Sequence, residues 1–198
     1  MTNNRHSVAY AALLEERRRE LRALMVQALP YRRPFVWEVG CGHGHFLTAY
    51  ARAHPDKWCV GVDIAGERIE RALRKRDRAK LANLHFIRTE AGLFLECLSH
   101  ESLLSELFVL FPDPWPKLRH HKHRIMQPAF LTLAAAHATT DCRLCFRTDF
   151  EPYFKEVCAA VEGHTRWGRV QETWPFEYET VFQSRAAAHR SLIARLQP

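Results

Sequence analysis

The sequence predicts an α/β fold in which helices cover both faces of a mostly parallel sheet. Short apolar runs alternate along the chain with longer helix-like segments. A glycine-rich turn, Gly40–Gly44, joins the first apolar run to the next helix-like segment. Acidic residues follow several of the predicted strands. Because ligands of such sheets bind beyond the carboxyl ends of the strands, we expect the functional site at that edge.

Length and charge predict one soluble domain with a polyanionic partner. A chain of 198 residues can bury roughly 70% of its unfolded surface as one domain. We expect that domain to span residues 1–198, with 1–30 as an N-terminal helical extension. The net charge of +7 favours nucleic acid as a partner and an acidic membrane surface second. No run approaches the ~18 apolar residues of a membrane span, and no signal peptide is recognisable, so we expect a cytoplasmic protein.

The first elements are a helix, a strand and a second helix. Apolar residues at helical spacing predict a helix from Ser7, as its cap, to Leu29. Its arginines favour a solvated face over an RNA contact. A strand over Phe35–Val39 and a helix over Phe46–Ala53 then flank the glycine turn. The pattern is G-x-G-x-G, whereas the dinucleotide fingerprint needs glycine at position 45, which is His45 here. A nicotinamide dehydrogenase is therefore disfavoured.

The next two strands each lead to an acidic residue. The strand Trp58–Asp63 ends in a carboxylate that can accept hydrogen bonds from both ribose hydroxyls of an adenosine. Asp63 can also cap the following helix, Glu67–Lys80. Both roles can hold, and the spacing of Asp63 from the glycine turn favours the ribose. That helix carries seven basic residues, and a solvated face and an RNA contact remain equally open: Arg68, Arg71, Arg74, Lys75, Arg76, Arg78 and Lys80. A third strand, Leu84–Arg88, leads to Glu90, which we expect near the adenine edge, and a short helix over Gly92–Leu98 follows.

The fourth strand, Leu107–Phe111, leads into the most unusual stretch of the chain. Three prolines around Asp113 and Trp115 prevent regular structure and stiffen the turn. A basic tract follows, consisting of Lys117, Arg119, His120, His121, Lys122, His123 and Arg124. This combination predicts a base-reading pocket beside a phosphate-binding surface; the alternative is a surface loop before a solvated helix start. A zinc site at the three histidines is disfavoured because no fourth ligand lies nearby.

The remainder of the chain continues the alternation of helices and strands. We expect a helix over Lys122–His137, a strand over Cys142–Phe146, a helix ending at Val161, a strand over Thr165–Thr173 and a last strand over Ser191–Arg195.

One cysteine pair has the C-x-x-C spacing found in zinc sites. Cys142 and Cys145 are three positions apart on a predicted strand, so they should face opposite sides of the sheet. We therefore expect no metal there.

Four motifs together resemble those of the bacterial tRNA (guanine-N7-)-methyltransferases. They are Glu38-Val-Gly-Cys-Gly-His-Gly44, Gly61-Val-Asp63, Phe111-Pro-Asp-Pro-Trp-Pro-Lys117 with Arg119-His120 and Lys122, and Thr148-Asp149. The first is generic to methyltransferases that use S-adenosyl-L-methionine, whereas the third is specific to this family. The resemblance runs from about residue 35 to the C-terminus. It implies a Rossmann-like class I methyltransferase with a seven-stranded, mostly parallel sheet and an antiparallel last strand.

The resemblance also implies methyl transfer from S-adenosyl-L-methionine to N7 of a guanosine in the tRNA variable loop. It implies tRNA as partner. From the residues themselves we expect no metal and no membrane, and the sequence leaves a monomer and a homodimer both open. The alternatives are a methyltransferase of this fold acting on another RNA or a small molecule, and an RNA-binding protein that binds the donor without turnover.

Residue roles carry over by position from the resemblance. Donor contacts would come from Glu38, Gly40, Gly42, Gly44, Asp63, Glu90 and Asp113, of which Asp113 would be catalytic. Substrate contacts would come from Lys117, Asp149, Thr180 and Gln183. From their charge, we also expect Lys117, Arg119, Lys122 and Arg124 to hold phosphates of the substrate. The chain departs from the family at Gln183, where the family has Glu, and at His123, where it has Arg. The Arg-rich N-terminal segment of the family is not recognisable before residue 35.

The expected chemistry requires no general base, because guanine N7 already carries a lone pair. Alignment of the reacting atoms and electrostatics should provide most of the catalysis. A carboxylate can accept hydrogen bonds from the N1–H and the exocyclic amino group of guanine. Asp113 or Asp149 is therefore expected to clamp a base that has left its stack.

Overall fold

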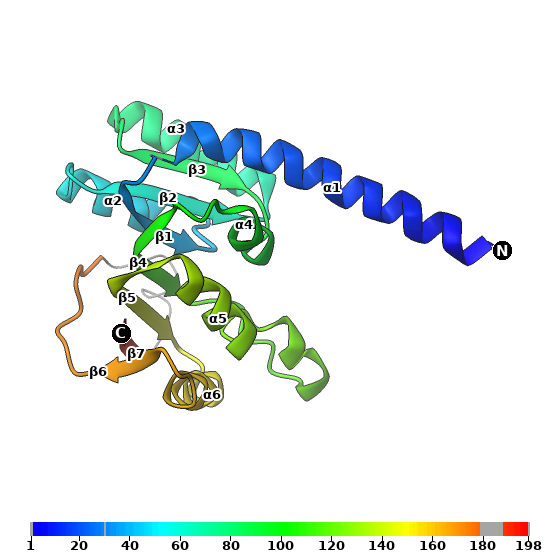
Figure 1. Ribbon diagram of the computed structural model, residues 1–198. Coiled ribbons are helices and arrows are strands. Elements are labelled where there is room, and N and C mark those ends of the chain that lie inside the picture. The colour runs from blue at the N-terminus through cyan, green and yellow to red at the C-terminus, as the bar shows by residue number, and fades with distance from the viewer. Residues whose placement is uncertain (1, 30, 179–187, 198) are drawn as a thin grey trace.

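The computed structural model describes residues 2–29, 31–178 and 188–197. Its centre is a seven-stranded sheet with the order β3-β2-β1-β4-β5-β7-β6 (Figure 1). The strands are β1 (Pro34–Val39), β2 (Trp58–Asp63), β3 (Leu84–Arg88), β4 (Leu103–Leu110), β5 (Ala138–Thr148), β6 (Trp167–Val170) and β7 (Arg190–Leu196). Only β7 runs antiparallel to its neighbours, β5 and β6, while the other pairs are parallel. The predicted seven-stranded, mostly parallel sheet is thus confirmed.

Helices cover both faces of the sheet, as predicted. They are α1 (Thr2–Ala28), α2 (His45–Ala53), α3 (Gly66–Ala79), α4 (Ala91–Cys97), the 3-10 helix η1 (Leu118–His123), α5 (Pro128–His137) and α6 (Glu151–Glu162). One core cluster joins the sheet to α1, α4, α5 and α6, and the other joins it to α2 and α3. The edge of the sheet at the carboxyl ends of the parallel strands, called the site edge below, is therefore flanked by different helices on its two sides.

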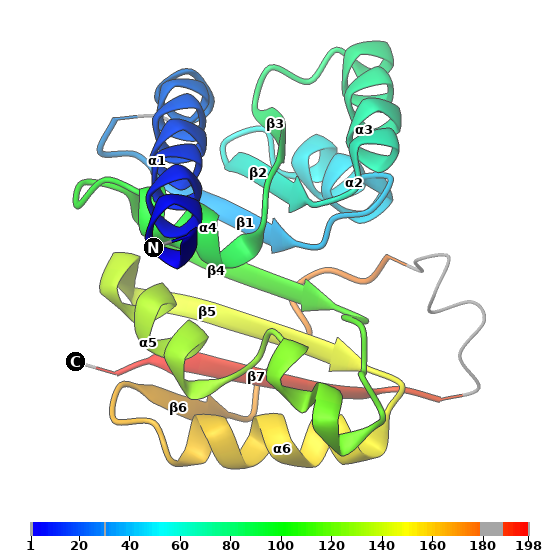
Figure 2. The ribbon, with the colours of Figure 1, turned by 90° about the vertical axis from the view of Figure 1, so that its right-hand side faces the viewer.

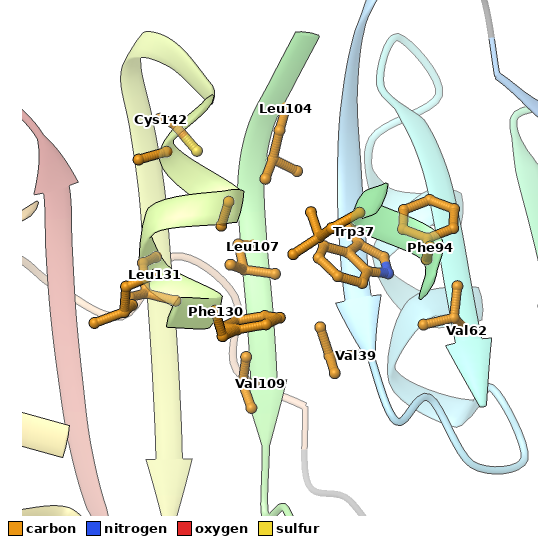
Figure 3. Packing of buried hydrophobic residues seen from close by; sticks show 14 of the residues in the cluster. Trp37, Val39, Val62, Phe94, Leu104, Leu107, Val109, Phe130, Leu131 and Cys142 are labelled. Atoms are coloured by element: carbon orange, nitrogen blue, oxygen red, sulfur yellow. The ribbon is translucent and has the colours of Figure 1, made fainter. Parts of the chain in front are cut away.

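The larger core cluster is centred on Trp37 of β1. Its indole lies 4.8 Å from the ring of Phe94 in α4 and 5.9 Å from Phe130 in α5 (Figure 3). The preceding residue, Val36, belongs to the cluster under α2 instead. Both faces of β1 are therefore buried against apolar clusters, as expected for a central parallel strand. This packing fixes the position in the sheet at which β1 ends and its glycine turn begins.

The strand registers place the functional turns at one edge. Val39 pairs with Val62 of β2 and with Val109 of β4, so three parallel strands end almost level. On the other side of β4, Leu110 pairs with Arg147 of β5. Figure 2 shows the arrowheads of β1, β4 and β5 pointing toward the same edge. The turns that follow these strands consequently lie close to one another.

Two helix predictions need correction. The first helix begins at Thr2, so Ser7 lies inside it and does not cap it. The expected helix over Lys122–His137 is wrong at its start, because α5 begins only at Pro128. Proline favours the first position of a helix, where its missing N–H costs nothing. The residues before it form η1 and an extended connection.

Several strand boundaries also differ from the prediction. β4 begins at Leu103 and β5 at Ala138, each four residues earlier than expected. β6 covers only Trp167–Val170 within the expected Thr165–Thr173. The apolar runs locate the buried part of each strand, whereas strand pairing continues into polar residues that periodicity does not mark.

The helix α1 contacts the rest of the protein through its C-terminal half. Leu21, Met25 and Ala28 are buried in the larger cluster, and Arg18 pairs with Glu96 of α4 at 2.9 Å. Figure 1 shows the N-terminal part of α1 extending away from the sheet. In the part of the chain that the structure describes, no helix is both long enough and apolar enough to cross a bilayer.

The C-x-x-C cysteines do face opposite sides of the sheet. Cys142 lies in the cluster shared with α5 and α6, and Cys145 lies in the cluster under α2. Both are fully buried. Among the described residues, no group of three or more His, Cys, Asp or Glu side chains is arranged to hold a metal ion.

Candidate functional site

The glycine turn after β1 has two parts with different surroundings. Gly40, Gly42 and Gly44 have φ angles of 66°, 54° and 67°, a region in which side chains are strained. A Cβ at Gly44 would lie 2.5 Å from the Phe86 ring and 2.8 Å from Ala72, so this glycine serves helix–sheet packing. A Cβ at Gly40 or Gly42 would meet nothing within 4 Å. These two glycines border open space that a ligand can enter.

Asp63 at the end of β2 holds this turn in place. Its Oδ2 accepts a hydrogen bond from the Gly42 N–H at 2.9 Å, and its Oδ1 accepts one from the Ala65 N–H at 2.8 Å. Arg68 lies 3.7 Å from Oδ2. The expected helix-cap role is wrong, since Ala65 occupies the N-cap position of α3 and no side chain caps that end. A carboxylate oxygen can accept more than one hydrogen bond, so these contacts do not prevent Asp63 from binding a ribose hydroxyl as well. The ribose role stays a prediction.

Glu38 has the surroundings of a ligand-binding group. It is 4% exposed, and its Oε2 has no hydrogen-bond partner in the described part of the chain. Burial raises the pKa of Glu38 well above its ordinary range; the Leu47 backbone N–H opposes this shift, and the Asp63 charge adds to it. A buried polar atom without a partner is costly. A ligand that donates a hydrogen bond beside the open side of the glycine turn would satisfy it.

The turn after β4 is held rigidly at both ends. Phe111 and Trp115 have φ angles of 49° and 42°, which is unusual for non-glycine residues. At the first end, the Phe111 N–H donates to the Arg147 C=O at 2.7 Å. At the second, Arg124 donates to the C=O of Pro114 at 2.8 Å and to the C=O of Trp115 at 3.2 Å. The prolines and these anchors keep the backbone around position 113 in a strained conformation.

Between these anchors, Asp113 is exposed and makes no hydrogen bond or ion pair with the described residues. Trp115 is 36% exposed, and its ring lies 5.7 Å from the His120 ring and 5.2 Å from the His123 ring. The turn thus presents a free carboxylate and a partly open aromatic face at the site edge.

The structure does not support a phosphate contact by Arg124. Its side chain is almost completely buried and forms an ion pair with Glu156 of α6. Its guanidinium lies 4.8 Å from the centre of the Tyr153 ring. That expectation is therefore corrected: the charge is used inside the protein to hold the turn. The other three cations expected at the phosphate surface are exposed, namely Lys117, Arg119 and Lys122.

The remaining predicted residues fall into three groups. Asp149 is exposed after β5, next to the turn that carries Asp113, because β4 and β5 are paired neighbours. Glu90 is exposed at the N-cap position of α4 and makes no side-chain capping bond. Thr180 and Gln183 lie outside the described residues.

One cluster near the site was not identified from the sequence. Arg147, at the end of β5, is buried and donates two hydrogen bonds to Glu177, at 3.0 and 2.9 Å. Its guanidinium lies 3.9 Å from the centre of the Trp174 ring. Phe176 belongs, like Trp174 and Glu177, to the segment that follows β6. The centre of its ring lies 5.3 Å from the centre of the Tyr50 ring of α2. The signal that could have found it is an arginine at the end of the apolar run of β5.

Comparison with known proteins identifies the family. A family model described as a putative methyltransferase matches residues 32–190. The chain belongs to this family. A tRNA (guanine-N(7)-)-methyltransferase of Chromohalobacter salexigens is 37% identical over 131 residues, which cover 66% of this chain and 53% of that protein. A Streptomyces coelicolor protein of the same name is 36% identical over 132 residues, covering 67% and 49%. The chain spans about half the length of the curated relatives it matches.

Solved structures of methyltransferases share the fold. The 16S rRNA methyltransferase KamB aligns with a TM-score of 0.62 at 18% identity, over 91% of this chain and 92% of that one. A 16S rRNA (adenine(1408)-N(1))-methyltransferase from Catenulisporales acidiphilia aligns with a TM-score of 0.58 at 18% identity, over 92% and 91%. The fold is thus the Rossmann-like class I methyltransferase fold, as the sequence predicted.

Proposed function

We propose that this protein transfers a methyl group from S-adenosyl-L-methionine to N7 of a guanosine in the variable loop of tRNA, in the cytoplasm. The observation that carries the proposal is the rigid turn that presents Asp113 at the same edge as the glycine turn. Exposed cations continue directly from that turn. The names of the relatives support the same substrate and the same position of methylation.

The residues around the glycine turn fit the proposed donor. The open space beside Gly40 and Gly42 lets a ligand approach the backbone closely. The unpartnered Glu38 Oε2 can accept a hydrogen bond from an ammonium or hydroxyl group. Asp63 keeps the turn in shape and would accept a hydrogen bond from a ribose hydroxyl. When bound, S-adenosyl-L-methionine supplies an electrophilic methyl group.

The residues after β4 would bind and orient the guanine. Its N7 lone pair is free, so no side chain has to remove a proton. Asp113 would accept hydrogen bonds from N1–H and the exocyclic amino group, with Asp149 on the neighbouring strand end as the other candidate clamp. Methylation leaves the ring cationic, and a nearby carboxylate favours that charge. The rigid turn limits the motion of Asp113, which benefits a step that depends on alignment.

The phosphate groups of the substrate would meet Lys117, Arg119 and Lys122. All three are exposed, in or next to η1. Roles for Thr180 and Gln183 in substrate binding remain part of the proposal.

Methyl transfer from labelled donor to an unmodified tRNA transcript tests the proposed reaction. We expect incorporation with the wild type, strong loss with Asp113→Ala, and loss when the variable-loop guanosine is replaced by adenosine. Retained incorporation into the adenosine transcript would show a different substrate position. Calorimetric binding of donor and tRNA without any methylated product would identify a binding protein without turnover.

A further inference from the structure

A second basic surface lies on the opposite side of the site edge from η1. It is a cleft of about 260 Å³ between the glycine turn and α3. Its lining consists of His43, His45, Arg71, Arg74, Lys75 and Arg78. The six residues are all polar, and none is acidic. The cleft therefore has the chemistry of an anion site.

The cations of α3 are arranged in one stripe. Arg71, Arg74, Lys75 and Arg78 are separated by three, four and seven positions, so they share one face of the helix. Like charges at this spacing destabilise a helix. Arg74 has one distant partner, Glu70, at 4.0 Å, and both side chains are exposed. In the described part of the chain, neither Arg71 nor Arg78 has a carboxylate within ion-pair distance. The stripe is thus largely without counter-charge.

Neighbouring ionisable groups respond to this positive charge. Burial lowers the pKa of His43, and Arg71, Arg68 and Lys75 lower it further. Burial also lowers the pKa of Lys75, with a contribution from Arg78. Burial also lowers the pKa of His45, with contributions from Lys75 and His43. Both shifts favour the neutral imidazole, which can donate a hydrogen bond without adding to the repulsion.

The cleft is attached directly to the candidate donor site. The Lys75 ammonium donates a hydrogen bond to the His43 C=O at 2.9 Å, which links α3 to the glycine turn. The helices α2 and α3 cover one face of the sheet, and α4, α5 and α6 cover the other. Figure 2 shows α2 and α3 above the strand ends and the segment after β4 below them. An extended anion can therefore contact basic groups on both sides of the edge.

We propose that this cleft binds phosphate groups of the tRNA backbone, as a second contact surface distinct from Lys117, Arg119 and Lys122. The inference rests on the proposed function. Arginine favours phosphate because its planar group offers several donors in a fork. RNA is favoured over an anionic membrane, because membrane-binding surfaces combine cations with apolar side chains. The lining of this cleft contains no apolar side chain.

The test measures the affinity of an unmodified tRNA transcript by fluorescence anisotropy at several salt concentrations. The variant is Arg71→Ala with Arg78→Ala, which removes two cations that form no ion pair in the described part of the chain and keeps the Lys75 hydrogen bond to His43. The control is Arg52→Ala with Arg169→Ala: two exposed arginines, one in the last turn of α2 and one on the edge strand β6. We expect the variant to bind about tenfold more weakly at 100 mM salt, and its log–log salt slope to fall by about one to two units. The control should match the wild type.

The methyl-transfer assay separates this inference from the proposed function. The Arg71, Arg78 variant should show a raised KM for tRNA with little change in kcat, because the cleft is not the place where the guanine would react. Wild-type methylation of tRNA with an unchanged salt slope in the variant would overturn the cleft assignment alone. A wild type that neither binds nor methylates tRNA would overturn both. Binding of the wild type, but not the variant, to phosphatidylserine vesicles at unchanged tRNA affinity would assign the cleft to a membrane instead.

Discussion

Replacing Arg124 with alanine should destabilise the protein and disturb the turn that carries Asp113. In the structure the buried guanidinium donates to two backbone carbonyls, those of Pro114 and Trp115. Hydrogen bonds from charged donors contribute about 1.5 kcal/mol or more each when buried. The turn is only partly buried, so water can replace some of this. The contact with the Tyr153 ring adds about 2 kcal/mol, because both groups are buried.

The expected loss in the free energy of unfolding is therefore about 3–4 kcal/mol. The ion pair with Glu156 adds little, because that carboxylate is half exposed. Urea unfolding with linear extrapolation measures the change. Arg119→Ala is the matched control, since it removes an exposed arginine from the same segment and should cost less than about 0.5 kcal/mol.

The kinetics of the two variants should differ in kind. Arg124→Ala releases the backbone on both sides of Trp115, so kcat for methyl transfer should fall even at saturating tRNA. Arg119→Ala removes a proposed phosphate contact, so it should raise KM and weaken the salt dependence of binding. If Arg124→Ala unfolds like the wild type and changes only KM and the salt slope, Arg124 contacts phosphate and the anchoring role is wrong.

Three further predictions concern the glycine turn and the carboxylate before it. Gly44→Ala should lower the free energy of unfolding by about 2 kcal/mol or more, because its Cβ would overlap Phe86 and Ala72 in a strained conformation. Equal unfolding midpoints for this variant and the wild type would contradict the packing role of Gly44. Gly42→Ala should cost only about 1–2 kcal/mol but weaken donor binding in calorimetry, because its Cβ enters open space; unchanged affinity would show that the donor does not approach there. The raised pKa of Glu38 means that the folded state binds a proton more tightly than the unfolded state, so this group reduces stability progressively as pH rises above the ordinary carboxyl value. The Glu38→Gln variant should therefore unfold at a higher urea concentration than the wild type at pH 7.5 and lose that advantage toward pH 4.5. If the unfolding midpoints of the two proteins change in parallel with pH, the pKa of Glu38 is not raised.

The sequence located the site edge because its signals are local. Glycines at alternate positions require a turn with positive φ, and prolines on both sides of Asp113 exclude regular structure there. Apolar runs marked the buried strands, and parallel strands bring their carboxyl ends to one edge. The motif from Phe111 to Lys117 then predicted the family to which the chain belongs.

The same signals were weaker for helix starts and for polar strand ends. The basic tract before α5 was expected to be helical from Lys122, but the helix begins only at Pro128. No local pattern distinguishes a short 3-10 turn of charged residues from the first turn of an α-helix.

What the sequence by itself determined is the fold class, the glycine turn and the rigid acidic turn at a common edge. Only the tertiary structure decided how individual charged side chains are used. Arg124 and Arg119 belong to one basic tract, but Tyr153 and Glu156 of α6, some thirty residues further on, enclose only the first. Likewise, the hydrogen bond from the Gly42 N–H to Asp63 joins residues 21 positions apart. Burial and partners come from elements distant in sequence, so a local pattern shows which charges are present but not which remain free to meet a ligand.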